Sequence, residues 1–182
     1  MEVIIRSADI GDAEEIATVH TRAWHESYHD LIDRSFLKNA ITLERNLPRR
    51  IAALEKAATG HGHPHYVAIL PGQSIVGFAC CGKWRESGGL TEPEGEISAI
   101  YLLDSAKRKG IGKKLFLACA RDLLEKNMKT MALWVLQENI PARRFYEAMG
   151  GRCVKENTPL TFGDQEYLEC AYLYDDLTRF KA

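Results

Sequence analysis

Two short stretches of the sequence carry side chains whose types and spacing could do chemistry. Residues 25–29 read His-Glu-Ser-Tyr-His, and a helix would place both histidines of this His-Glu-x-x-His pattern on one face. In zinc peptidases the two histidines hold the metal and the glutamate is the general base. Residues 107–114 read Lys-Arg-Lys-Gly-Ile-Gly-Lys-Lys, a turn that suits an anion instead. The two stretches predict different chemistry, so the elements that position them must decide between them.

The basic stretch lies at the start of an amphipathic helix that we predict over residues 110–127. A helix N-terminus already carries partial positive charge, so each cation there is unfavourable by roughly a few tenths of a kcal/mol. Gly110 and Gly112 let the backbone curl tightly and expose its N–H groups. These features predict an anion site that suits a polyphosphate, although a solvated basic turn would have the same composition. The cations are Lys107, Arg108, Lys109, Lys113 and Lys114.

Two widespread phosphate-binding motifs do not account for this turn. A Walker P-loop is excluded because the Gly-x-x-x-x-Gly-Lys-Ser/Thr pattern is missing. A Rossmann fingerprint needs Gly-x-Gly-x-x-Gly in a parallel βαβ unit, and only Gly-x-Gly is present. The turn therefore has to be interpreted together with the elements that follow it.

Composition narrows the class of protein. The 182 residues suit one domain, over residues 1–182, with a substantial core of its own. Hydrophobic residues make up 46%, charged residues 27%, and the net charge is −1, so neither nucleic acid nor a membrane is expected as a partner. The sequence has no long uncharged apolar run, and its first residues do not have the pattern of a signal peptide. We expect a cytoplasmic protein.

Cysteines and histidines elsewhere in the chain predict no metal site. The five cysteines are odd in number and include no Cys-x-x-Cys, so buried free thiols are expected rather than a disulfide framework. Residues 61–65 read His-Gly-His-Pro-His, which is more typical of a solvated loop than of a metal site because no cysteine accompanies it.

Hydrophobic periodicity predicts an α/β fold in which helices pack on a mixed sheet. Asp9 or Asp12 is expected to cap the first helix, and Pro48 to break the second helical region or start a new helix within it. Pro71 and Gly72 suit a hairpin turn, and a polar loop is expected over 85–95. The predicted strands cover 3–8, 65–70, 75–84, 96–103, 130–136, 152–161 and 165–174, and the predicted helices run to about 29, over 33–58, 110–127 and 140–151.

Two motifs follow each other across residues 95–151. The first reads Lys107-x-x-Gly110-x-Gly112 at the basic turn. The second comprises Asn139, Ala142, Phe145, Tyr146, Glu147 and Gly150 in the pattern Asn-x-x-Ala-x-x-Phe-Tyr-Glu-x-x-Gly. Together they resemble the GNAT family, the Gcn5-related N-acetyltransferases. Lys107 departs from the family's glutamine or arginine, so it keeps a charge but loses the planar fork of an arginine.

The resemblance implies a fold and a cosubstrate. The implied fold has a central, mostly antiparallel sheet of about seven strands with splayed central strands, flanked by about four helices. Acetyl-CoA would place its pyrophosphate on the basic turn and pair its pantetheine arm with the preceding strand. No metal is implied. The implied cofactor-binding residues are Ile100, Leu102, Lys107, Arg108, Lys109, Gly110, Ile111, Gly112, Lys113, Asn139 and Tyr146.

The resemblance also implies how an acetyl group would move to a primary amine in a ternary complex. An amine is mostly protonated at neutral pH, so a base must accept its proton, and Glu96 lies where several members of the family place a catalytic glutamate. A surface glutamate at a strand end is the alternative. Tyr146 resembles the tyrosine that protonates the departing thiolate, with a core tyrosine as the alternative. Asn139 is expected to cap the following helix and to contact the cofactor.

The sequence indicates the acceptor site less clearly than the cosubstrate site. Trp24, Tyr28 and Trp84, with Glu26 beside them, are candidate substrate-binding residues, and each suits a core or surface position equally well. The acceptor would be a small-molecule amine or a protein amine. In this family the last strands often help to form a homodimer, so that assembly is also implied.

Two other functions stay open at this point. A zinc peptidase needs a third ligand, and Glu44 has no motif around it, while Asp30 stands where that pattern wants an uncharged residue. A non-catalytic acyl-CoA sensor would keep the basic turn without the chemistry.

Overall fold

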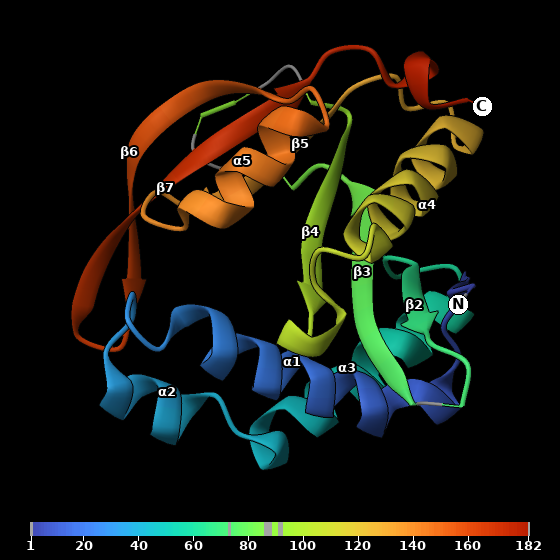
Figure 1. Ribbon diagram of the computed structural model, residues 1–182. Helices are drawn as coiled ribbons and strands as arrows, with labels where there is room; N and C mark the ends of the chain where they lie inside the picture. Colours follow the sequence, from blue (N-terminus) through green and yellow to red (C-terminus); the bar gives the residue numbers. More distant parts are fainter. Residues whose placement is uncertain (1, 73, 86–88, 91–92, 182) are drawn as a thin grey trace.

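The computed structural model describes residues 2–72, 74–85, 89–90 and 93–181. Its centre is a seven-stranded sheet in the order β1-β2-β3-β4-β5-β7-β6 (Figure 1). All neighbouring strands are antiparallel except β4 and β5, which are parallel. The strands are β1 (Ile4–Ser7), β2 (His65–Ile69), β3 (Ile75–Lys83), β4 (Gly95–Leu102), β5 (Met131–Leu136), β6 (Arg152–Phe162) and β7 (Gln165–Tyr174). The predicted mixed sheet, mostly antiparallel, is confirmed.

In the described residues, five α-helices cover the two faces of the sheet, one more than expected. In Figure 1, α1, α2 and α3 lie together in the lower part of the view, and α4 and α5 lie above them. None of the helices in the described residues is long and apolar enough to cross a membrane. The helices are α1 (Ala13–Tyr28), α2 (Arg34–Ala40), α3 (Leu43–Ala58), α4 (Ile111–Glu125) and α5 (Ile140–Ala148).

Each face of the sheet has its own core. On one face, Leu115, Phe116 and Leu123 of α4 pack with residues of β3, β5 and β7, and α5 adds Tyr146. On the other face, Ile16 of α1 belongs to a cluster with residues of α3, β2 and β3. The buried positions of α1 and α4 recur at intervals of three and four residues, which is the pattern that predicted these helices. All five cysteines are free thiols, and four of them are buried, as expected.

The prediction for residues 33–58 was wrong about where the helical region breaks. The region forms two helices separated at Ile41 and Thr42, and Pro48 lies inside α3 without ending it. Thr42 has an extended backbone, and its side chain accepts a hydrogen bond from Arg45 N, so it caps α3. Pro48 is the sixth residue of α3, beyond the N–H groups that lack a partner inside the helix, so it removes one helical hydrogen bond and the helix continues through it.

The sheet splits between β4 and β5. These strands pair only at Gly95 with Met131 and at Glu96 with Ala132. Beyond that point β4 continues along β3 as far as Leu102, while β5 continues along β7. We call the resulting gap the wedge: it is closed at Glu96 and opens toward the C-terminal ends of both strands. The expected splay of the central strands is confirmed.

Candidate functional site

The N-terminus of α4 is an uncapped helix end beside the open side of the wedge. Gly110 is the N-cap residue, and no side chain makes a capping hydrogen bond there. The first helical hydrogen bond runs from Lys114 N to Gly110 O at 3.2 Å, so the N–H groups of the three residues between them have no partner within the helix. By contrast, side chains cap α2, α3 and α5. Free N–H groups and a positive dipole end together suit an anion.

Glycine is favoured at both predicted positions of this turn, for different reasons. Gly110 has φ +76°, a left-handed conformation that side chains disfavour, and a Cβ there would meet no atom within 4 Å. Gly112 is limited by space, because a Cβ would lie 3.2 Å from Leu102 Cδ1 and 3.6 Å from the Phe145 ring. The missing side chain therefore lets the start of α4 pack closely on β4 and α5.

The turn is fastened to α1. Lys107 Nζ donates to Ser27 Oγ at 3.0 Å and pairs with Asp104 Oδ1 at 2.6 Å. The backbone N–H of Asp104 donates to Glu26 Oε2 at 2.7 Å. Glu26 and Ser27 belong to the 25–29 stretch, so this part of the pattern orders the basic turn. The Glu26 carboxylate is directed at the turn, and its predicted place in an acceptor site stays a prediction.

The histidines of that stretch also have protein partners. His25 Nε2 donates to the Ile41 carbonyl at 2.9 Å, which ties α1 to the end of α2. His29 Nδ1 donates to the Glu26 carbonyl at 3.1 Å, and its other ring nitrogen lies 2.8 Å from Asp30. In the described part of the chain no group of three or more histidine, cysteine, aspartate or glutamate side chains could hold a metal ion. A zincin site is therefore not assembled there.

The edge of β4 that faces the wedge has unpaired backbone groups. Directly after β4, the backbone N–H of Leu103 donates to the carbonyl of Val76 in the neighbouring strand β3, at 3.0 Å. Backbone groups of successive residues point to opposite edges of a strand, so those of Ile100 and Leu102 point away from β3 and toward the wedge. No β5 residue pairs with them. This edge leaves backbone groups available to an extended ligand, and its binding to these two residues stays a prediction.

Tyr146 lies on α5 and is 7% exposed. Its ring is 5.4 Å from that of Phe145 and 6.0 Å from that of Tyr172, measured between centroids. Burial raises the pKa of the Tyr146 hydroxyl, with a smaller contribution from the nearby Tyr101 hydroxyl. The phenol therefore stays protonated at neutral pH and can act as a hydrogen-bond donor.

Asn139 caps α5, and this prediction is confirmed. Its side chain accepts from Ala142 N at 3.2 Å, and Pro141 occupies the first turn of the helix. The residue is almost buried, and its side chain also interacts with the Tyr28 hydroxyl of α1. Asn139, Tyr28 and Tyr146 are therefore brought together where α1, β5 and α5 meet.

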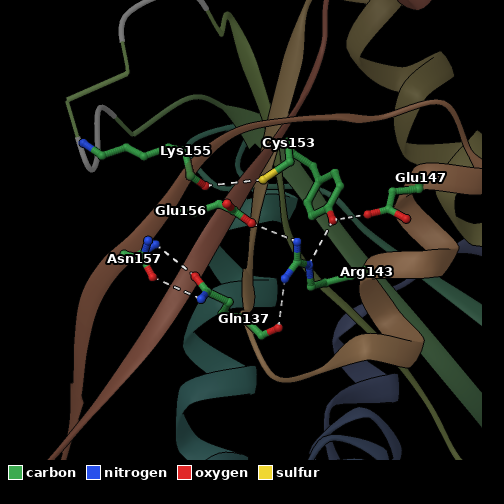
Figure 2. A network of polar contacts seen from close by, with 8 residues as sticks. Gln137, Arg143, Glu147, Cys153, Lys155, Glu156 and Asn157 are labelled. Carbon is green, nitrogen blue, oxygen red and sulfur yellow. Dashed lines mark hydrogen bonds and ion pairs between the residues drawn. The ribbon is translucent and has the colours of Figure 1, made fainter.

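A network centred on Arg143 fixes α5 against the last strands (Figure 2). Arg143 donates to Tyr172 Oη at 3.1 Å, to the Gln137 carbonyl at 3.2 Å and to Glu156 Oε1 at 3.0 Å. The Tyr172 hydroxyl in turn donates to Glu147 Oε1 at 2.6 Å. The family motif includes Glu147 but neither Tyr172 nor Arg143, so the contacts that hold the Tyr146 helix in place were not predicted.

Glu96 is a buried carboxylate at the closed end of the wedge, 4% exposed. Arg85 Nε donates to Glu96 Oε1 at 2.5 Å, and His63 Nδ1 lies 3.8 Å from the same oxygen. Desolvation lowers the pKa of His63, although the charge of Glu96 raises it. The alternative of a surface glutamate is thus wrong for the position of Glu96, and its two neighbours were not predicted.

The predicted acceptor residues differ in their surroundings. Trp24 and Tyr28 have ring centroids 4.9 Å apart, and Trp24 also contacts Tyr101 and Phe162. Burial raises the pKa of Tyr28. Trp84 is 7% exposed, and its indole N–H donates to the Leu90 carbonyl at 3.1 Å. The predicted polar loop that follows Trp84 lies partly outside the described residues, at 86–88 and 91–92.

These features together define a class of protein, an α/β acyltransferase-type fold with a candidate anion site next to an open strand edge. They are the uncapped basic helix end, the wedge beside it, and the buried Tyr146 and Glu96. Comparison with known proteins agrees. The model of the acetyltransferase (GNAT) family matches residues 16–151. A Bacillus subtilis protein described as the uncharacterized N-acetyltransferase YuaI is 31% identical over 156 residues, which are 85% of this chain and 83% of the relative. The chain belongs to the GNAT family of acetyltransferases.

Solved structures share this fold. The PaiA N-acetyltransferase of Thermoplasma acidophilum, crystallised in complex with coenzyme A, has a TM-score of 0.73 at 19% identity and covers 93% of this chain and 98% of its own. YncA of Salmonella typhimurium, solved with its cofactor acetyl-CoA, has a TM-score of 0.69 at 18% identity over 95% of this chain and 93% of its own. At these identities the likeness concerns the fold.

Proposed function

We propose that this protein transfers an acetyl group from acetyl-CoA to a primary amine of a small molecule or a protein, by direct attack in a ternary complex. The observation that carries this proposal is the adjacency of the uncapped basic start of α4 and the unpaired edge of β4. One is a site for a pyrophosphate and the other is a site for an extended arm, and acetyl-CoA contains both groups in sequence.

The cosubstrate would lie along the open side of the wedge. Its pyrophosphate accepts hydrogen bonds from the N–H groups of Ile111, Gly112 and Lys113, and Arg108 and Lys109 add positive charge. Lys107 supports the turn rather than the ligand, because its ammonium is held by Ser27 and Asp104. The pantetheine arm pairs with the backbone of Ile100 and Leu102, which leads the thioester into the wedge.

The chemistry needs a base for the amine and an acid for the thiolate. The amine nitrogen attacks the thioester carbonyl carbon and the C–S bond breaks. Glu96 accepts the amine proton, directly or through water, at the closed end of the wedge. Tyr146 donates a proton to the departing sulfur, because a phenol with an ordinary pKa of about 10 is already protonated at neutral pH, and burial raises that pKa further. Asn139 orders the start of the Tyr146 helix.

A thermal-shift titration combined with a thiol-release assay tests the proposal. Acetyl-CoA should raise the melting temperature, because a ligand that binds only the folded state stabilises it. An amine panel should then release CoA thiol. No thermal shift at millimolar acetyl-CoA would contradict the proposal entirely, whereas a shift without thiol release across a broad panel would indicate a non-catalytic acyl-CoA sensor. Zinc at one equivalent after metal-free purification would instead support the peptidase.

Three further predictions accompany this function. We expect a single acetyltransferase domain, a cytoplasmic location and, as the family's last strands allow, a homodimer. Size-exclusion chromatography with light scattering tests the homodimer directly.

A further inference from the structure

A half-buried carboxylate on β7 has no role in the site described so far. Glu169 pairs with Leu136 of β5 on one side and with Thr158 of β6 on the other. Directly opposite residues of antiparallel strands point to the same face of a sheet. Leu136 packs in a cluster with Trp24 and Tyr28 of α1, so Glu169 is directed to the face that α1 covers.

No group in the described part of the chain neutralises the Glu169 carboxylate. Among the described residues, Glu169 has no ion pair and no hydrogen-bond donor, and burial raises its pKa without an opposing charge. The residues outside the described ranges include no lysine, arginine or histidine that could supply one. Beside it, Thr158 Oγ1 is buried without a hydrogen-bond partner in the same described part of the chain. Two adjacent polar groups of this kind are costly unless a ligand satisfies them.

Aromatic rings stand around the same face. Phe162 contacts both Trp24 of α1 and Tyr167 of β7, at centroid distances of 5.5 Å and 5.6 Å. Trp24 Nε1 is buried, and the indole interacts with the Tyr101 hydroxyl of β4. An acid among aromatic rings suits an organic cation, because ring faces attract positive charge and the carboxylate neutralises it.

We propose that Glu169 binds a second positive charge of the acceptor, so that the preferred substrates are diamines, polyamines or other amines that keep a fixed cation after the reacting amine is deprotonated. This inference rests on the proposed acetyltransferase function. Glu96 and Glu169 are opposite Ala132 and Leu136 of β5, four residues apart, or ~13 Å along the strand. The reacting amine, in the wedge, and the second cation, at Glu169, are thus separate positions within one elongated site.

Matched acceptors test the inference. Thiol release is measured with 1,8-diaminooctane against octylamine and with 1,10-diaminodecane against decylamine, because these diamines are long enough to occupy both positions, and a short lysine-containing peptide amide tests a peptide source of the same chemistry. We expect the kcat/KM of the wild-type protein to favour each diamine by about 10- to 100-fold, the range of a hydrogen bond to a charged group. In Glu169→Gln the ratio of diamine to monoamine should fall close to one. Equal rates for matched pairs in the wild-type protein would overturn the inference.

Glu166→Gln is the control, because Glu166 is exposed and lies three residues from Glu169 on the opposite face of β7. It should keep the diamine preference. If Glu169→Gln does not fold, Glu169→Asp keeps the charge on a shorter side chain and should lower the preference in part. The acetyl-CoA-induced thermal shift of each variant reports folding and the cosubstrate site separately. Monoamine turnover without diamine preference contradicts this inference alone, whereas no turnover with any amine contradicts the proposed function.

Discussion

The two faces of the split sheet are built in different ways. On the face covered by α4 and α5, the candidate cosubstrate site consists mainly of backbone groups of one continuous segment, from Ile100 to Lys113. On the face covered by α1, the candidate acceptor site consists of side chains from α1, β4 and β7. A site made from backbone needs glycines at fixed intervals and leaves a motif, whereas a site made from scattered side chains leaves none. The first could therefore be predicted and the second could not.

The two faces are nevertheless joined through one helix. Glu26 and Ser27 of α1 hold the basic turn, while Trp24 and Tyr28 of the same helix face the acceptor side. Any movement of the end of α1 would therefore change the geometry of both the candidate cosubstrate site and the candidate acceptor site. The following variants test the cosubstrate face, the acceptor face and the connection between them, starting with the largest expected effect.

Removing the Tyr146 hydroxyl tests whether the chemistry lies at the junction of the two faces. Tyr146→Phe should lower kcat by about 100-fold or more, because the departing thiolate loses its acid. The acetyl-CoA dissociation constant should change by less than about twofold, since the ring still fills its place. Steady-state kinetics and calorimetric binding measure the two effects. Tyr66→Phe removes another inward hydroxyl, one that donates to Asp122 away from the wedge, and should leave kcat unchanged. Equal turnover in Tyr146→Phe would remove this residue from the mechanism.

Gly110→Val tests whether the cosubstrate face depends on backbone conformation. Valine disfavours the left-handed conformation at φ +76°, so the turn should open and the dissociation constant of acetyl-CoA should rise about 10- to 100-fold. Gly60 is a matched control, because it has φ +75° and also meets no atom within 4 Å of an added Cβ. Gly60→Val should lose a similar amount of stability, about 1–3 kcal/mol, and keep its affinity. A similar loss of affinity in both variants would assign the effect to stability alone.

Glu26→Ala tests the connection between the faces. The variant removes the acceptor for Asp104 N, so the turn should be less ordered and acetyl-CoA should bind about 3- to 10-fold more weakly. Arg22→Ala is the control, since Arg22 forms an exposed ion pair with the same carboxylate at 3.5 Å, and such pairs contribute little. Calorimetric titration of both variants decides the point. Unchanged affinity in Glu26→Ala would mean that α1 does not order the turn.

The fold, and the helix and turn that form the candidate cosubstrate site, were predictable because local patterns specify them. Residues 111–125 have helical periodicity, Asn139 stands before Pro141 as a capping signal, and Gly110 and Gly112 mark the turn. The start of α3 was missed because Thr42 caps it in a sequence that looks continuously helical, and Pro48 is a more conspicuous signal.

The rest of the site depends on contacts between residues far apart in the sequence. Arg85 and Glu96 are held together by the pairing of β3 with β4, and Glu169 reaches the acceptor face through the register of β7. The His-Glu-x-x-His pattern shows the opposite problem. Its spacing is right for zinc, but its glutamate and both histidines form hydrogen bonds with backbone groups, and no local sequence pattern predicts these bonds.

The smallest expected effect concerns the unneutralised carboxylate of the acceptor face in the absence of ligand. Burial raises the pKa of Glu169 above its ordinary value of 4.5. Below pH 4.5 the group is protonated in the folded and unfolded chains alike, so its stabilising contribution is fully present. As the pH rises through the folded pKa, the unfolded chain releases the proton more readily and that contribution is lost.

Glu169→Gln does not titrate, so its melting temperature relative to wild type should increase between pH 4 and pH 7, by roughly 2 °C. Scanning fluorimetry across this range measures the difference, and Glu166→Gln, at an exposed position on the opposite face of β7, is the control. A constant difference at all pH values would mean that Glu169 is solvated or already paired. Glu169 would then not be an unneutralised carboxylate on the acceptor face.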